Sequence, residues 1–176
     1  MTGVNDRHVM TARWRLEAPA SAVWPLLADL PGWPRWWPHL RAPRRQPPAA
    51  RSGRAEVAEF EQRGVWSWPP WTTGLRVTTT HVEPLRLMEW SAEADAGALA
   101  SLAGAGCWLI EPAGGGTEVT LRWSRRVAAP RWSQIWLGLI VEWQHFRQMR
   151  AGAAGMAALL QCRAPAVSQW AAHRRG

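Results

Sequence analysis

The chain has 176 residues, a mass of 19.7 kDa and 47% hydrophobic residues, enough for one substantial core, which excludes a mainly disordered chain. Its net charge is +8, but all 21 basic residues are arginines scattered along the chain, so we expect no specific nucleic-acid binding. Cys107 and Cys162 have no metal-ligand spacing, which argues against structural zinc and leaves them as small buried side chains.

The first part of the chain predicts one strand and two short helices. Apolar and polar residues alternate from Met10 to Glu17, which is typical of a strand. Residues 19–29 predict a helix, which Pro25 should kink or shorten. Residues 33–38, bounded by prolines, predict a second short helix or turn.

The middle of the chain loses helical periodicity and predicts a run of strands joined by short turns. The glycines at 114–116 supply the left-handed backbone that a tight hairpin turn needs. Residues 66–71 contain adjacent prolines and predict a loop. The predicted strands cover residues 40–45, 53–63, 73–83, 86–94, 105–111 and 117–127.

The last predicted element is a long amphipathic helix over residues 132–161. At about 100° per residue, one stripe of this helix is apolar and should face the core. The stripe contains Trp132, Ile135, Trp136, Leu139, Trp143, Phe146, Ala153, Ala157 and Leu160. We expect residues 163–176 to form a frayed tail. The order of elements predicts one α+β domain, residues 1–162, with an antiparallel sheet curled around the last helix.

Tryptophan is strongly over-represented, with 15 residues against 2 Phe and no Tyr. One explanation is mutational pressure toward a GC-rich codon. The other is a hollow fold that uses indole faces as walls, since so many indoles are difficult to pack into a small solid core. The two explanations are compatible.

Four motifs mark this order of elements. They are Glu-Ala-Pro-Ala-Ser-Ala-Val-Trp at 17–24, Leu-Ala-Asp-Leu-Pro-Gly-Trp-Pro-Arg-Trp-Trp-Pro at 27–38, Val-Glu-Pro at 82–84 before Leu87 and Trp90, and Gly-Gly-Thr-Glu-Val at 115–119. With the terminal helix they resemble the START-like or SRPBCC superfamily, the polyketide cyclase/dehydrase and lipid-transport family. The resemblance implies a helix-grip fold, in which a seven-stranded antiparallel sheet wraps around the long helix and leaves a deep cavity.

Strand alternation and the helix stripe supply candidate walls for such a cavity. The predicted inward residues of the strands include Met88, Trp90, Trp108 and Trp123. Ordinary core packing explains the same pattern equally well, because apolar periodicity reports burial and not a void. The candidate ligand-binding residues are Met88, Trp90, Trp108, Trp123, Leu139, Glu142, Trp143 and Phe146.

Glu142 and His81 are the candidates for chemistry. Glu142 lies near the buried stripe, where a carboxylate is costly unless it is paired or faces a polar pocket. It could act as a general acid or base, or form an ion pair with Arg150 or with an arginine of the sheet. His81 titrates near neutral pH if a cavity exposes it, although a strand histidine is more often a surface or packed residue. No histidines share a metal-ligand spacing with a carboxylate, so we expect neither a metal nor a cofactor.

Four tryptophans, Trp36, Trp37, Trp66 and Trp71, would lie near the cavity mouth in the family's arrangement. They could form a gate, or an exposed apolar patch for a membrane surface or a protein partner. The sequence leaves these alternatives open.

The leading interpretation is a cytoplasmic protein that binds a hydrophobic or aromatic small molecule, such as a lipid or polyketide, in an internal cavity. Residues 1–10 lack the apolar run of a signal peptide, and no segment has the ~18 apolar residues that span a bilayer. The alternative is a cofactor-independent polyketide cyclase or dehydratase in which Glu142 or His81 moves protons. A third possibility is a protein-interaction or regulatory module. The ligand, the oligomeric state, the pathway and the orientation of His81 stay open.

Overall fold

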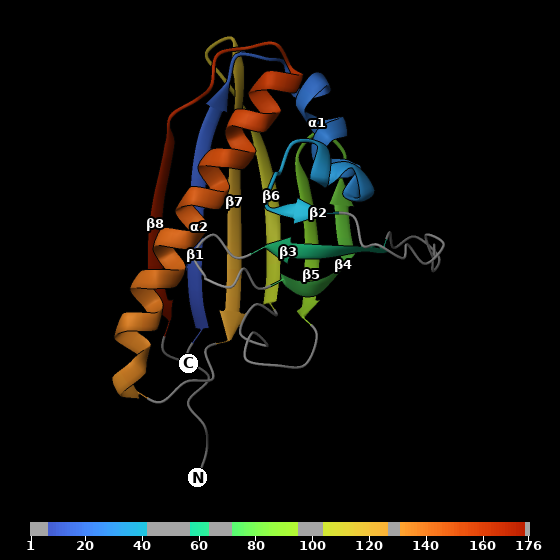
Figure 1. The fold of residues 1–176 in the computed structure, drawn as a ribbon. Helices are drawn as coiled ribbons and strands as arrows, with labels where there is room; N and C mark the ends of the chain where they lie inside the picture. The colour runs from blue at the N-terminus through green and yellow to red at the C-terminus, as the bar shows by residue number, and fades with distance from the viewer. Residues whose placement is uncertain (1–6, 42–56, 64–71, 95–103, 127–130, 175–176) are drawn as a thin grey trace.

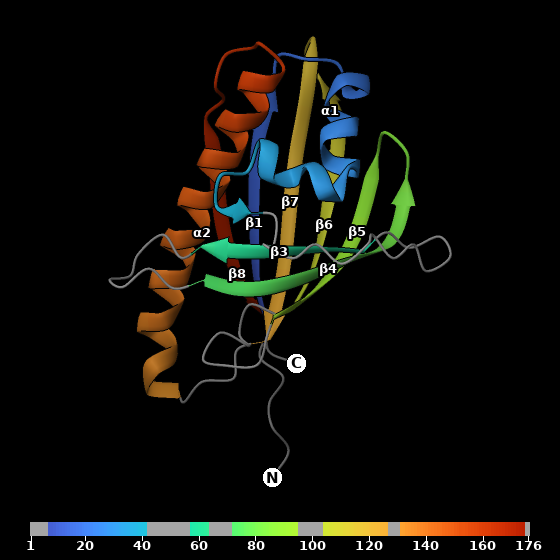
Figure 2. The same cartoon turned by 45° about the vertical axis from the view of Figure 1, so that its right-hand side comes forward.

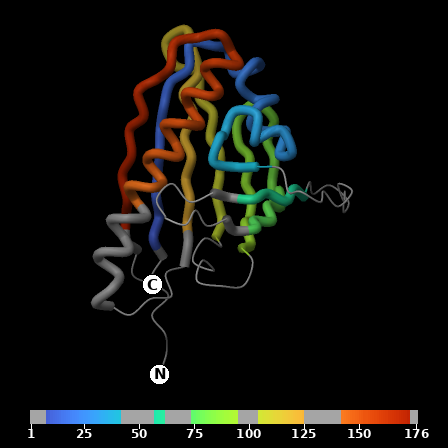
Figure 3. Tube along the Cα trace, in the orientation of Figure 1, coloured from blue at the N-terminus to red at the C-terminus, as the bar shows by residue number. Residues whose placement is uncertain are grey.

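The computed structural model describes residues 7–41, 57–63, 72–94, 104–126 and 131–174 (Figure 1). The side chains of the long helix are described from Glu142 onward, where the tube in Figure 3 takes its colour. In this part of the chain, no helix is long and apolar enough to cross a membrane.

The helices and strands follow the predicted order, with one strand added at the end. They are β1 (Arg7–Leu16), α1 (Ala20–Ala28), the 3-10 helix η1 (Leu30–Arg35), β2 (Leu40–Arg41), β3 (Val57–Arg63), β4 (Thr72–Glu83), β5 (Leu87–Ala94), β6 (Gly104–Ala113), β7 (Gly116–Arg126), α2 (Arg131–Leu159) and β8 (Val167–Arg174). The predicted hairpin between β6 and β7 is confirmed, because Gly114 and Gly115 adopt φ values of 47° and 87°, as the tight turn requires.

The strands form a single antiparallel sheet in the order β2-β3-β4-β5-β6-β7-β1-β8. Figure 1 shows β3 running across the direction of β1 and β7, so the sheet curls into a half-barrel. Helix α2 approaches the sheet most closely along β1 and β8, while α1 and η1 cover the other side of the concave face (Figure 2). The curled sheet and C-terminal helix of the predicted helix-grip fold are confirmed, but the sheet has eight strands and not seven.

The eighth strand corrects the expectation of a frayed tail. β8 pairs antiparallel with β1 from Arg7↔Arg174 to Trp14↔Val167. Its sequence, VSQWAAHR, has few of the β-branched and aromatic residues that mark strands. The pairing therefore comes from the edge that β1 offers and from side-chain contacts with α2, neither of which the local sequence pattern reveals.

The register places inward-facing residues of neighbouring strands in rows across the concave face. One row contains Met10, Trp123, Gly106, Trp90 and Thr79, from β1, β7, β6, β5 and β4. The four non-glycine residues of this row are at most 7% exposed. We refer to this set as the central row.

Candidate functional site

A cluster of aromatic rings centred on Trp33 of η1 covers one end of the concave face. Trp33 is 1% exposed. Its ring centroid lies 5.8–6.2 Å from those of Trp36, Trp37, Phe60, Trp90 and Trp108. We call these six residues the indole cluster. At this end of the molecule the rings form a packed core rather than the walls of an open space.

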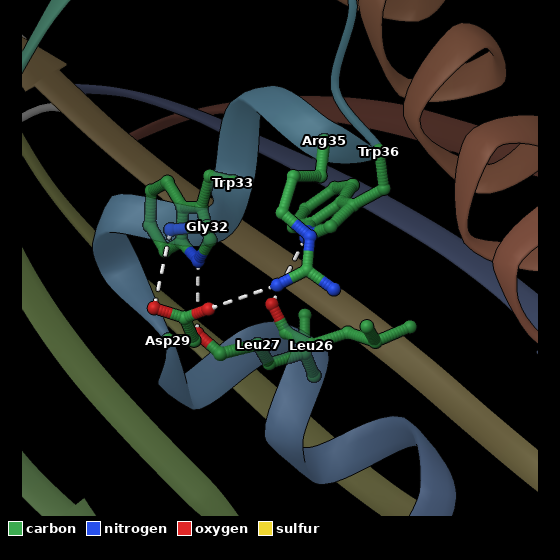
Figure 4. A network of polar contacts seen from close by, with 7 residues as sticks. All are labelled: Leu26, Leu27, Asp29, Gly32, Trp33, Arg35 and Trp36. Atoms are coloured by element: carbon green, nitrogen blue, oxygen red, sulfur yellow. Dashed lines mark hydrogen bonds and ion pairs between the residues drawn. The ribbon is translucent and has the colours of Figure 1, made fainter. Parts of the chain in front are cut away.

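Two indole N–H groups fix η1 against α1. Trp33 Nε1 donates to the Leu27 carbonyl and Trp36 Nε1 to the Leu26 carbonyl, both at 2.9 Å (Figure 4). These carbonyls lie near the C-terminal end of α1, where the last carbonyls of a helix lack partners within it. The two buried indoles therefore supply hydrogen-bond donors to carbonyl groups at the C-terminal end of α1.

Asp29 closes the turn between α1 and η1. Its side chain accepts a hydrogen bond from the Gly32 amide at 3.2 Å and lies 3.5 Å from the Arg35 guanidinium (Figure 4). An aspartate at the start of a helix satisfies an amide that would otherwise lack a partner. This contact orients the segment that carries the two indoles.

The predicted mouth residues Trp36 and Trp37 are only 2% and 4% exposed. Both belong to the indole cluster and lie against Gly152 and Gly155 of α2, so they do not stand on an exposed loop surface. Prolines and tryptophans in a short segment indicated a stiff loop, but the sequence could not show that α2 covers it. Residues 64–71, with Trp66 and Trp71, lie outside the described residues.

The predicted burial of Met88, Trp90, Trp108 and Trp123 is confirmed, because their exposed fractions are 1%, 3%, 0% and 4%. All four face the concave side of the sheet, as strand alternation requires. The side chain of Leu139 lies outside the described part of α2.

Several buried indoles have an N–H group with no hydrogen-bond partner among the described residues. An unpaired buried donor costs about 1–3 kcal/mol, and such groups are uncommon in folded proteins. The hydroxyl of Thr79 in the central row is in the same state. The indoles concerned are those of Trp14, Trp37, Trp90, Trp108 and Trp123. Apart from Trp37, which follows η1, these donors belong to strands of the sheet.

Two aromatic side chains of α2 that the apolar stripe placed in the core are not fully buried. Trp143 is 43% exposed, with the Arg147 guanidinium 5.1 Å from its ring centroid. Phe146 is half-buried, with the Arg150 guanidinium 5.8 Å from its ring. Cation–π contacts stabilise aromatic rings at such surface positions. Trp143 therefore lies on the outer side of this helix, and Phe146 lies at the border of its buried face.

In the described part of α2, the inward face carries polar as well as apolar residues. His145 and Gln148 are 2% and 3% exposed. His145 Nδ1 lies 2.8 Å from Gln169 Oε1 of β8, and Gln169 Nε2 donates to the main-chain carbonyl of Glu142 at 3.0 Å. Buried polar residues are more informative than exposed apolar ones, and here they lie where β8 joins α2 to the sheet.

Glu142 contacts a histidine of β1. Its Oε1 lies 3.1 Å from Nε2 of His8, in place of the predicted arginine. His8 is 2% exposed and Glu142 is 31% exposed. Extending the alternation of the first strand from Met10 back by two residues places His8 on the inward face. This alternation was the sequence signal that could have predicted the burial of His8.

The histidines connect this region to the tryptophans. The ring of His145 packs edge-on against Trp123, with centroids 6.0 Å apart, and Trp123 packs in the same way against Trp90 at 5.9 Å. We call His8, Glu142, His145 and Gln169 the polar cluster. It lies beside the central row, at the junction of β1, β8 and α2.

His81 does not belong to this arrangement. Its side chain is 52% exposed and its Nε2 lies 3.3 Å from Glu83 Oε1; this hydrogen bond is the main reason why the pKa of Glu83 lies below its usual value. A bulge between Thr79 and His81 interrupts the strand alternation. Neither His81 nor the neighbouring Val82, 43% exposed, faces the core.

The described residues contain no group of three histidine, cysteine, aspartate or glutamate side chains that could hold a metal ion. Cys107 and Cys162 are both half-buried free thiols, and burial raises the pKa of Cys107.

Gly106 makes room for the Trp90 ring, and its replacement tests that packing. A Cβ atom at Gly106 would lie 2.2 Å from the Trp90 ring, so Gly106→Ala should displace this indole and destabilise the fold by about 1–3 kcal/mol. Urea denaturation measures the loss, and near-ultraviolet circular dichroism reports the indole. Ala105→Ser, on the exposed face of the same strand, is the control. An unchanged near-ultraviolet spectrum for Gly106→Ala would contradict the placement.

Comparisons with known proteins agree with this architecture. A family model described as polyketide cyclase / dehydrase and lipid transport matches residues 7–161. The Zhui aromatase/cyclase from Streptomyces sp. R1128 superposes with a TM-score of 0.64 at 16% identity, covering 89% of this chain and 94% of its own. A protein from Thermus thermophilus gives 0.66 at 17% identity, covering 87% and 97%. A START superfamily protein from Mycobacterium smegmatis gives 0.64 at 12% identity, covering 87% and 99%. No curated protein matches the sequence.

Proposed function

The chain belongs to the polyketide cyclase/dehydrase and lipid transport family, and we propose that it binds a hydrophobic, oxygen-bearing aromatic molecule against the central row of its concave face. The observation that carries the proposal is the set of buried donors in this row. The indole N–H groups of Trp90 and Trp123 and the hydroxyl of Thr79 have no hydrogen-bond partner among the described residues. A ligand oxygen would satisfy them, and its rings would pack against the indoles.

The neighbouring row supports the same location. It contains Gly104, Ala92, Val77 and Ala58, which are register neighbours on β6, β5, β4 and β3. The Trp123 indole lies over the glycine of this row, since a Cβ atom at Gly104 would be 2.8 Å from its Nε1, so the N–H faces this row. The alanines of this row carry less side-chain bulk than the aromatic residues beneath η1, which supports a binding surface on the Trp123 side of the central row.

The first test is a binding experiment with the indoles as reporters. We expect polycyclic aromatic ligands with carbonyl or hydroxyl groups to quench tryptophan fluorescence saturably, and their unsubstituted hydrocarbons to bind more weakly. Native mass spectrometry of the protein purified from its own host searches for the natural ligand. A flat response across a broad panel of lipids and polycyclic aromatics would overturn the proposal.

Tryptophan-to-phenylalanine variants separate the ligand donors from the structural ones. Trp90→Phe and Trp123→Phe remove an N–H that has no partner among the described residues, so no hydrogen bond of the fold is lost. A neutral hydrogen bond contributes about 1 kcal/mol, so each variant should bind an oxygen-bearing ligand about fivefold more weakly in calorimetry.

Two controls make this series specific. Trp170→Phe changes a 45% exposed indole beside Arg13 and should leave binding unchanged. Trp33→Phe removes the hydrogen bond to Leu27 and should lower stability by about 1 kcal/mol. Wild-type affinity in both Trp90→Phe and Trp123→Phe counts against the proposed donors.

The polar cluster favours a second candidate function, a cyclisation or dehydration that needs no cofactor. His8 and Glu142, two ionisable groups, lie 3.1 Å apart beside the central row, where either could exchange a proton with a substrate bound within hydrogen-bond reach. If turnover of a bound substrate is found, Glu142→Gln should abolish most of it while the apolar part of the substrate still binds. Full turnover in that variant would exclude this role for Glu142.

A further inference from the structure

The strand β8 forms one edge of the sheet, and no other described strand pairs with its outer side. It comes last in the order of strands, beside β1, and Figure 1 shows it at the left margin of the sheet. It also lies beyond residues 7–161, which the family model matches. Its register with β1 is continuous over all eight of its residues. The outer side of β8 is therefore a long, regular row of backbone N–H and C=O groups.

The two edges of the sheet differ in how they are protected against pairing with another chain. Native proteins protect exposed edges with very short strands, bulges, prolines or charged side chains. The strand at the opposite edge, β2, has only two residues. β8 has eight residues, contains no proline, lysine or acidic residue, and carries its one arginine at the last position. Of the two edges, β8 is the one suited to pairing with a further strand.

An exposed indole lies near the middle of β8. Trp170 is 45% exposed, and the Arg13 guanidinium lies 5.4 Å from its ring centroid. Arg13 is paired with Glu118 at 3.3 Å, which offsets its charge beside the ring. The two neighbours of Trp170 on the same face of β8, Ser168 and Ala172, are small. This face of the strand therefore carries one large apolar ring between two small side chains.

We propose that β8 pairs antiparallel with β8 of a second copy of this chain, around a two-fold axis that places the two copies of Trp170 opposite each other. Such an interface requires a surface that is complementary to itself. An antiparallel strand edge meets this requirement, because the same donors and acceptors face each other from both sides. In this register Ser168 of each copy lies opposite Ala172 of the other, so the flanking side chains leave room for the indole pair.

Charge and hydrogen bonding favour a second copy over another extended partner. Antiparallel pairing places the two copies of Arg174 at opposite ends of the interface, about 27 Å apart at 3.4 Å per residue, where their repulsion is screened. An acidic peptide would meet a single arginine in β8, at the end of the strand. The paired strands form about six to eight backbone hydrogen bonds, comparable to the ten or so of a typical interface. Aromatic pairs across neighbouring strands add to this stabilisation.

Analytical ultracentrifugation of the full chain over a concentration series tests the proposal. The mass should rise from 19.7 kDa toward twice this value as the concentration reaches about 100 µM, because modest interfaces often have micromolar dissociation constants. Trp170→Glu and Trp170→Lys should each weaken self-association about tenfold or more, since each places like charges directly opposite each other. Trp170→Phe keeps an aromatic pair and should associate as the wild type does.

An equimolar mixture of the two charged variants tests the register. Trp170→Glu and Trp170→Lys together should associate more tightly than either variant alone, because opposite charges then face each other across the axis. Val82→Glu and Val82→Lys are the matched controls. Val82 is 43% exposed on β4, which β5, β6, β7 and β1 separate from β8, so these variants should associate as the wild type does. Thermal melting checks that all four variants are folded.

Hydrogen exchange tests the pairing in the wild-type protein, so this test stands even if substitution of Trp170 impairs folding. In an antiparallel ladder, alternate amides of β8 bond to β1, and the remaining amides face outward. The outward amides should exchange rapidly in dilute protein and become protected as the concentration rises. The amides bonded to β1 should show the same protection at both concentrations.

Four outcomes would overturn the proposal. In the first, the wild-type chain stays monomeric across the series, whether or not another extended peptide binds β8. In the second, the chain dimerises equally well in both charged variants, because the copies then meet through another face. In the third, the mixture associates no better than its components, which excludes Trp170 at the axis. In the fourth, the outward amides are protected in the dilute monomer, because another segment of the same chain then covers β8. The proposed function is unaffected by all four, since its ligand binds on the concave face.

Discussion

Replacing Trp33 by alanine is expected to destabilise the protein by about 3–5 kcal/mol, the range for deletion of a large buried aromatic side chain. Trp33 is 1% exposed and its ring contacts five other aromatic rings. The substitution also leaves the Leu27 carbonyl without its indole donor. Typical stabilities are only 5–15 kcal/mol, so urea denaturation should show a large loss, and the variant should melt well below the wild type.

Two further variants test whether the loss of stability comes from the buried position of Trp33. Trp170→Ala removes the same side chain from a position that is 45% exposed on β8, and should cost less than about 1 kcal/mol. Trp33→Phe keeps a ring in place and should lie between the two. If Trp33→Ala and Trp170→Ala unfold at the same urea concentration, Trp33 is not the centre of the aromatic packing.

The fold could be predicted from the sequence because its elements are marked locally. The alternation of apolar and polar residues predicts β1, and the adjacent glycines predict the β6–β7 hairpin. A long stretch of helical periodicity without a proline predicts α2. β8 escaped prediction because its pairing is specified by a neighbour more than 150 residues away, not by its own composition. This segment forms a strand because its backbone pairs with the edge of the sheet at β1 and its Gln169 side chain contacts α2.

The site was predictable only on the sheet. Strand alternation has a period of two, so the inward residues Met88, Trp90, Trp108 and Trp123 follow directly from the sequence. The helix face did not follow, because hydrophobicity assigned Trp143 to the interior. The structure instead buries His145, which Gln169 and Trp123 contact, and leaves Trp143 beside Arg147. Contacts with residues distant in sequence therefore determine which side chains of α2 face the core.

Helix α2 lies in close contact with the segment that carries Trp36, directly after η1. Gly155 of α2 faces the main chain of Trp36, where a Cβ atom would lie 1.9 Å from the carbonyl oxygen. Because that oxygen belongs to the backbone, no side-chain rotation relieves the clash, and the helix must move away from the indole cluster. The contact requires glycine despite its poor helix propensity.

Gly155→Ala is therefore expected to destabilise the protein by about 2 kcal/mol or more, the overpacking cost exceeding the roughly 1 kcal/mol that alanine gains in helix propensity. Gly152→Ala is the matched control, one turn earlier on the same face. A Cβ atom there would lie 3.3 Å from the Trp36 ring, a contact with a side chain that a small shift relieves. Its expected change is close to zero, because the propensity gain offsets the tighter packing. Urea denaturation of the two variants decides the matter: equal stability of both, or stabilisation by Gly155→Ala, means that α2 does not approach η1 as closely as the structure has it.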